Sequence, residues 1–179
     1  MGALVNAGAV HAVEIMEEQK YLTFLLGGEM FAVGILNTKE IIEYGNLTTV
    51  PMMSKFIRGV INLRGAVVPV IDLAARFGRI QAAITRRSCI VIIEVEAEGE
   101  KHDVGVVVDS VSEVLEIPTA EIEPAPGFGA KIRADFITGM GKVNNKFVII
   151  LNVNSVLSID EMAVLGSTMG GAQMAENGF

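Results

Sequence analysis

One stretch, residues 56–73, constrains the fold more than any other part of the chain. It holds two apolar runs rich in β-branched residues, 60–63 and 66–71, with Arg64-Gly65 between them. β-Branched residues favour strands and glycine tolerates the positive φ of a tight reversal, so the stretch predicts a β-hairpin. Pro69 cannot donate a hydrogen bond to a neighbouring strand. We therefore expect the second strand at a sheet edge or at a bulge.

Short helical segments are expected beside the hairpins. An earlier hairpin is predicted over 21–35, where two apolar runs flank Gly27-Gly28. Asn37 is followed three residues later by Glu40, a pattern typical of a helix start, and it predicts one or two helical turns through Tyr44. Asp72 is expected to cap a short helix over 73–77 that ends at Gly78.

The two halves of the chain are similar to each other. Residues 33–35 match 104–106, and Phe56-Ile57-x-Gly59 matches Phe136-Ile137-x-Gly139. Such a repeat indicates two related units. Each unit is small and would bury only a limited core by itself, so we expect two small β-barrels that pack against each other.

Composition excludes several classes of function. The net charge of −7 argues against nucleic-acid binding, which depends on cationic neutralisation of phosphates. The chain has no Trp and two Tyr, which leaves few rings for base stacking. No apolar run approaches the ~18 residues of a membrane-spanning helix, and the N-terminus lacks a secretory signal pattern. A cytoplasmic protein is the expectation.

Catalytic and metal-binding patterns are also missing from the sequence. His11 and His102 have no Cys or His partner at ligand spacing, and the single cysteine cannot form an internal disulfide. No phosphate-binding loop or Gly-x-Ser-x-Gly motif is present. We therefore expect no catalytic residue, no metal and no cofactor. The sequence leaves open whether the arginines near residues 76–87 form a solvated linker or a basic docking site; they are Arg76, Arg79, Arg86 and Arg87.

The hairpin stretch also resembles a known family. A strand, the turn Asn62-Leu63-Arg64-Gly65 and a second strand, 68–73, with the sequence Val-Pro-Val-Ile-Asp-Leu follow one another as in the bacterial chemotaxis coupling protein CheW, and the similarity covers roughly residues 19–165. The resemblance implies a mainly β fold of two pseudo-symmetric five-stranded SH3-like barrels. It places a CheW-like domain at 18–166, with the first barrel at about 18–80, the second at about 86–155 and a C-terminal helix at 159–165. Residues 1–17 are expected to be flexible and 167–179 disordered.

The same resemblance implies an adaptor rather than an enzyme. Members of the family join the cytoplasmic tip of methyl-accepting chemoreceptors to the regulatory domain of the histidine kinase CheA, at the receptor array beneath the inner membrane. It implies no nucleic-acid partner and no membrane insertion. The kinase is expected at the end of a barrel, through residues that the sequence does not identify. Carried over by motif, the receptor-binding residues are Ile35, Thr38, Glu40, Gly59, Asn62 and Arg64 and, across an inter-lobe groove, Val111 and Val114.

Arg64 is the strongest candidate among these residues. Its guanidinium could hold a carboxylate of the receptor, could be oriented internally by Glu40, or could lie in solvent at the turn. Many family members carry a β-branched apolar residue at the position of Thr38, so that contact is expected to be weaker here. Two other functions stay open. One is a coupling module of a related adaptor with a receiver domain, for which the 14 residues after Leu165 leave no room (179 minus 165). The other is a small-barrel protein that binds a small ligand or single-stranded nucleic acid.

Overall fold

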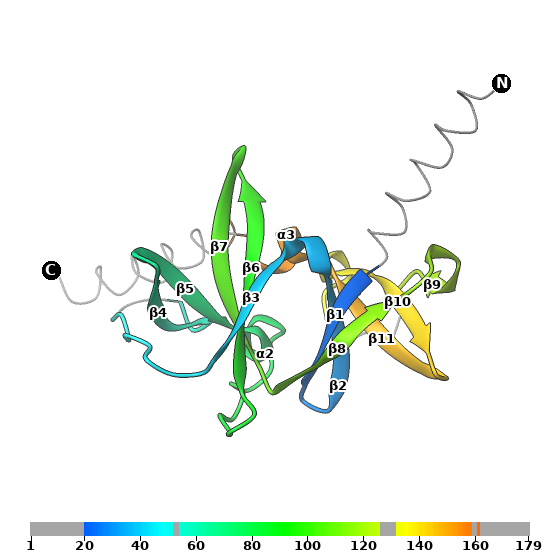
Figure 1. Ribbon diagram of the computed structural model, residues 1–179, viewed down its shortest axis with the longest axis horizontal. Helices are drawn as coiled ribbons and strands as arrows, with labels where there is room; N and C mark the ends of the chain where they lie inside the picture. Colours follow the sequence, from blue (N-terminus) through cyan, green and yellow to red (C-terminus); the bar gives the residue numbers. More distant parts are fainter. Residues whose placement is uncertain (1–19, 52–53, 126–131, 159–160, 162–179) are drawn as a thin grey trace, which may run out of the picture.

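The computed structural model describes residues 20–51, 54–125, 132–158 and 161, and its regular structure is mainly β, as predicted. Figure 1 shows two curved sheets side by side, with the short helices α2 (Leu73–Arg76) and α3 (Val153–Val156) between them. The expected flexible segment 1–17, the disordered tail 167–179 and all of the helix 159–165 except residue 161 lie outside the described residues.

The first sheet has six strands in the order β8-β1-β2-β11-β10-β9, and we call it the six-stranded lobe. Its strands are β1 (Lys20–Leu26), β2 (Glu29–Gly34), β8 (Ser110–Glu116), β9 (Ile122–Glu123), β10 (Ile137–Val143) and β11 (Lys146–Leu151). All neighbouring pairs are antiparallel except β2 and β11, which run parallel.

The second sheet has five strands in the order β3-β6-β7-β5-β4, and we call it the five-stranded lobe. Its strands are β3 (Thr38–Glu43), β4 (Ile57–Leu63), β5 (Ala66–Asp72), β6 (Cys89–Ala97) and β7 (Glu100–Val108). Here β5 and β7 form the parallel pair. A bridge between Thr48 and Val60 links the segment after β3 to β4, so the two ends of this sheet approach each other as in a barrel.

The lobes do not follow the chain in the way the sequence predicted. The hairpin β1–β2 pairs with β8 and β11 in the second half of the chain, whereas β6–β7 pairs with β3 and β5 in the first half. The predicted barrel boundaries, 18–80 and 86–155, are therefore wrong. Each half contributes a hairpin to the other lobe, so neither half has all the strands of one sheet.

The internal repeat is confirmed in three local features. The register shifts once between Ile57 and Gly59 in β4, and once between Ile137 and Gly139 in β10. Asp72 caps α2 and Asn152 caps α3, each accepting a hydrogen bond from the backbone N–H three residues on. The two caps also donate backbone N–H groups to equivalent carbonyls, those of Phe56 and Phe136.

One detail of the predicted repeat is wrong. Gly105 lies opposite Val70 in the β5–β7 pair, and the residue in the same position of the β2–β11 pair is Ala32, opposite Ile150. Residues 104–106 therefore match 31–33 rather than 33–35. The glycine at 34 suggested the wrong alignment.

Two expected elements differ from the structure. Segment 37–44 is not helical, because a 3-10 turn (η1, Ile35–Asn37) leads directly into strand β3. The burial of side chains alternates along β3 with the strand period of two, although one of its two isoleucines, Ile41, falls at an exposed position. Pro69 does not mark an edge, since β5 lies between β4 and β7. The missing N–H is tolerated because pairing with β7 begins only at Val70.

Three apolar clusters hold the fold together. The largest contains buried residues from both sheets and from α2 and α3. Four phenylalanine rings in this cluster contact one another in succession, and the centroids of successive rings lie 6.0, 5.3 and 6.3 Å apart. In order of contact they are Phe24, Phe31, Phe77 and Phe136. Each lobe also has a smaller cluster of its own. The interface between lobes is therefore a core, and it fixes their relative position.

Candidate functional site

The strongest sequence candidate lies at the turn between β4 and β5. Arg64 and Gly65 have φ values of 52° and 86°, so the predicted tight reversal is confirmed. Asn62 accepts a hydrogen bond from the Gly65 N–H through Oδ1 at 2.9 Å. Its amide therefore stabilises the turn locally.

Arg64 reaches from this turn to the edge strand β3. Its Nη2 donates to Glu40 Oε2 at 2.5 Å, with side-chain exposures of 77% for Arg64 and 24% for Glu40. Of the three possibilities for Arg64, the structure therefore contains the internal pair with Glu40. The outer face of the guanidinium remains accessible, so the pair presents an oriented donor group at the surface.

Thr38 begins the same edge strand, and Ile35 lies in the 3-10 turn η1 that precedes it. Both are half-buried, and Thr38 Oγ1 donates to the Gly34 carbonyl at 3.3 Å. Between Thr38 and Glu40 the register with β6 shifts, which marks a bulge at Lys39. The Lys39 ammonium lies 3.1 Å from Asp103 on β7 and 3.6 Å from Glu94 on β6, and Asp103 raises the pKa of Lys39. These contacts tie the outer strand to its neighbours.

Gly59 is buried, so it does not present its own surface to a partner. A Cβ placed there would lie 2.6 Å from the Thr48 carbonyl oxygen. The close approach of the two backbones forms the bridge that joins the ends of the five-stranded lobe. The structure therefore gives Gly59 a packing role within the five-stranded lobe, and its contribution to receptor binding stays a prediction.

Val111 and Val114 lie on β8, the edge strand of the other lobe. Val114 is 49% exposed and Val111 is half-buried. The strand has a bulge here, and Thr23 of β1 fills it: its hydroxyl donates to the Glu113 carbonyl at 2.7 Å and accepts from the Glu113 N–H at 3.2 Å. Thr23 thus fixes the part of β8 that presents Val114, and sequence reasoning did not identify it.

The structure brings only part of the predicted site together by direct contact. Glu40, Asn62 and Arg64 form one corner, hereafter the Glu40–Arg64 corner, with Thr38 on the same strand. The described residues include no hydrogen bond or ion pair between this corner and Val111 or Val114. The expected groove across the lobes therefore stays a prediction.

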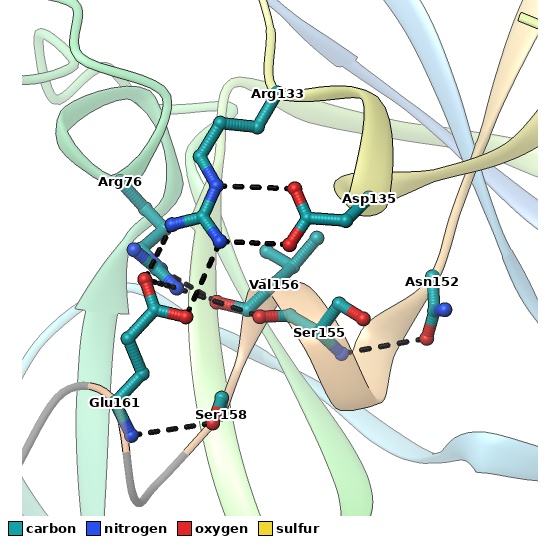
Figure 2. A network of polar contacts seen from close by, with 8 residues as sticks. All are labelled: Arg76, Arg133, Asp135, Asn152, Ser155, Val156, Ser158 and Glu161. Carbon is teal, nitrogen blue, oxygen red and sulfur yellow. Dashed lines mark hydrogen bonds and ion pairs between the residues drawn. The ribbon is translucent and has the colours of Figure 1, made fainter.

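A second polar cluster was missed by sequence reasoning, and Figure 2 shows it at the junction of the lobes. Arg76 is buried, and its guanidinium donates to the Val156 carbonyl at 2.7 Å and lies 3.2 Å from Glu161. It also lies 4.6 Å from the centre of the Phe136 ring, and Arg133 lies 4.4 Å from the same ring. Figure 2 shows Arg133 facing Asp135 and Glu161 at once.

The arginines near residues 76–87 therefore do not form one exposed group. Arg76 belongs to the junction, and Arg79 pairs with Glu29 at 3.0 Å. Only Arg86 and Arg87 are exposed. A basic docking site made of all four residues is ruled out by this placement.

Opposite charges shift the ionisation of the junction residues. The hydrogen bond from Arg133 holds the pKa of Glu161 below its usual range, against the opposing effect of burial, and Arg76 lowers it further. Arg133 lowers the pKa of Asp135 in the same way, while Asp135 and Glu161 raise the pKa of Arg133. The arrangement is that of a structural ion-pair network.

The described residues contain no group of three His, Cys, Asp or Glu side chains placed to hold a metal ion. None of the helices in the described part of the chain is long and apolar enough to cross a membrane.

Comparison with known proteins identifies the family. A family model described as CheW-like domain matches residues 20–161. The chemotaxis protein CheW of Klebsiella aerogenes is 34% identical over 147 residues, which cover 82% of this chain and 86% of that protein. CheW of Bacillus subtilis is 34% identical over 80% of this chain and 90% of its own length. The protein FrzA of Myxococcus xanthus is 30% identical over 82% of this chain and 89% of its own.

A solved structure agrees with these relatives. The scaffolding protein TtCheW of Thermoanaerobacter tengcongensis superimposes with a TM-score of 0.69 at 34% identity, covering 78% of this chain and 87% of that one. The two-lobed β architecture is thus that of a scaffold of bacterial chemotaxis. The chain belongs to the CheW family, as the sequence motifs predicted.

Proposed function

We propose that this chain is a cytoplasmic adaptor that couples chemoreceptors to the histidine kinase CheA. Its work is binding, and the proposal assigns it no reaction and no cofactor. Phosphotransfer belongs to the kinase. The effect of the adaptor on signalling is then a coupling free energy, which arises when it binds one receptor–kinase arrangement better than another.

The Glu40–Arg64 corner is the observation that carries this proposal. Arg64 is held by Glu40 yet remains 77% exposed, which is the arrangement expected of a group oriented for a partner rather than buried for stability. We assign the receptor to this corner, with Thr38 on the adjoining strand and Ile35 in the turn η1 before it. Val111 and Val114 are proposed to complete the receptor contact from the other lobe.

The kinase is assigned to a different face. We assign it to the end of a lobe, which the family resemblance implies, so that receptor and kinase can bind together. The apolar core shared by the two lobes supports this arrangement. Because the lobes are packed together, a shift at the receptor-binding face can change the position of the kinase-binding face.

The test is a three-component binding experiment with the purified chain, the regulatory domain of a CheA kinase and the cytoplasmic tip of a chemoreceptor. We expect the chain to bind each partner alone and to bring both into one complex in size-exclusion chromatography. Arg64→Ala should weaken binding of the receptor and leave binding of the kinase unchanged. If the wild-type chain binds neither partner, the proposed function is wrong.

A further inference from the structure

The six-stranded lobe has an open cavity of about 570 Å³ at one end. Its walls are mainly apolar and come from β1, β2, β8, β10 and β11. The apolar residues are Leu25, Met30, Leu115, Met140, Val143, Phe147, Val148 and Ile149. Phe147 is 53% exposed at its rim. Polar groups from Thr23, Glu29, Glu113, Asn144 and Lys146 also line it. It shares no residue with the Glu40–Arg64 corner, so the proposed receptor contact does not account for it.

The internal repeat shows what occupies the same place in the five-stranded lobe. Asn144 follows Val143 in the β10–β11 turn as Arg64 follows Leu63 in the β4–β5 turn, and the two turns have the same strand register. The φ values agree as well, at 51° for Asn144 and 52° for Arg64. Asn144 is therefore the counterpart of Arg64.

Glu113 is the counterpart of Glu40. Val91 in β6 and Leu22 in β1 are equivalent positions of the two exchanged hairpins. Val91 pairs with Ile41, the residue after Glu40, and Leu22 pairs with Val114, the residue after Glu113. Alternation along β8 places Glu113 on the same side as Leu115, and both line the cavity. The five-stranded lobe thus has a glutamate with its own arginine, whereas the six-stranded lobe has the glutamate and a short asparagine.

The charge on Glu113 has no partner among the residues that the structure describes. In the part of the chain that the structure describes, its carboxylate makes no ion pair, and neither does the ammonium of Lys146. Glu29, the other acidic residue of the lining, is paired with Arg79 at 3.0 Å. One exposed carboxylate therefore stands beside apolar walls at the place where the sister lobe supplies a guanidinium.

We propose that this cavity binds an arginine-bearing apolar segment of a partner protein. The guanidinium pairs with Glu113 as Arg64 pairs with Glu40, because its fork of donors matches a carboxylate. Its methylene stem and an adjacent apolar side chain contact the walls near Leu115 and Phe147. The cavity is then a second recognition site. A partner supplies the arginine for Glu113 there, whereas the chain supplies its own arginine, Arg64, for Glu40 in the other lobe.

The first test uses the peptide acetyl-Leu-Arg-Leu-amide, titrated into the full chain and followed by methyl NMR. We expect shifts of cavity methyl groups, including those of Leu25, Leu115 and Val143. The matched peptide with citrulline in place of arginine has the same shape without the charge. Its affinity should be lower by a factor of about five or more. Glu113→Gln should lower the affinity for the arginine peptide by a similar factor. Equal binding of the two peptides, or shifts located elsewhere, would overturn the proposal.

The second test places an arginine side chain of the chain itself in the cavity. Asn144→Arg recreates the Arg64 arrangement at a position whose φ already accommodates arginine in the sister lobe. The new side chain should pair with Glu113 and abolish peptide binding. Asn145→Arg adds the same charge to the same turn at a residue that does not line the cavity, and it should leave peptide binding nearly unchanged. An Asn144→Arg variant that binds the peptide as tightly as wild type would contradict the inference.

Discussion

The Arg64 guanidinium donates a hydrogen bond to the Glu40 carboxylate, with Nη2 and Oε2 2.5 Å apart. This bond joins a hairpin turn to an edge strand of the same lobe. Because Arg64 is mostly exposed, this ion pair adds only ~1 kcal/mol or less to stability. Its main effect is to limit the positions that the guanidinium can take. A partner that binds there meets a donor already in place, so less side-chain entropy is lost on binding.

Arg64→Ala should leave the fold intact and weaken receptor binding. Losing an anchor at an interface typically costs ~2 kcal/mol or more, which corresponds to roughly a thirtyfold rise in Kd. The measurement is a titration with the receptor tip, paired with thermal denaturation of the variant. An unchanged Kd at unchanged stability would remove Arg64 from the proposed site.

Glu40→Gln separates orientation from direct contact. If Glu40 only holds Arg64 in place, this variant should weaken receptor binding less than Arg64→Ala, and adding it to Arg64→Ala should have no further effect. The double-mutant cycle measures this coupling. Fully additive effects would mean that Glu40 contacts the receptor independently.

Gly59→Ala should destabilise the five-stranded lobe. The added Cβ would lie 2.6 Å from the Thr48 carbonyl oxygen, so the bridge between the lobe's two ends must open or shift. We expect a loss of ~1–3 kcal/mol in urea unfolding. Gly99→Ala is the matched control, because its Cβ meets nothing within 4 Å and only the positive φ is strained. Equal losses in the two variants would show that the close contact adds nothing.

The hairpins, the Arg64-Gly65 turn and the Asp72 cap could be predicted because each depends on residues close in sequence. The exchange of hairpins between lobes could not, since antiparallel pairing of β1 with β2 is the same whichever sheet they join. The strand β3 was mistaken for a helix because Asn37 and Glu40 imitate a capping pattern. Its placement depends instead on pairing with β6, more than 45 residues away (Ile42 opposite Ile90).

The candidate site shows the same limit. Arg64 was found from a family motif, but its partner Glu40 was only one of several possibilities until the turn and the edge strand were placed together. Arg76 and Thr23 were missed because their roles come from distant contacts, with Val156 and Glu113 respectively. Nothing in the residues next to Arg76 in the sequence shows whether its side chain is buried or exposed.

Thr23→Val tests whether the bulge in β8 depends on one hydroxyl. Valine has nearly the same shape, but it leaves the N–H and the carbonyl of Glu113 without this partner. Losing a hydrogen bond typically costs ~1 kcal/mol, and the amide of Glu113 should exchange faster with solvent. Thr38→Val is the control, since its hydroxyl makes one longer bond of 3.3 Å. Unaltered exchange at Glu113 would show that β8 is held by other contacts.

The junction network should make the protein sensitive to acid. The pKa values of Glu161 and Asp135 are lowered in the folded state, chiefly by hydrogen bonds from Arg133. Their stabilisation is therefore complete above the ordinary pKa values of about 4.3 and 3.9, and is lost as the pH falls through the lower folded-state values. Comparing Tm at neutral pH with Tm below pH 4 should show a smaller drop for Glu161→Gln than for wild type. Glu116→Gln changes an exposed strand residue outside the network and should drop as wild type does. The same drop in both variants would mean that Arg76 and Arg133 are held without help from the charge of Glu161.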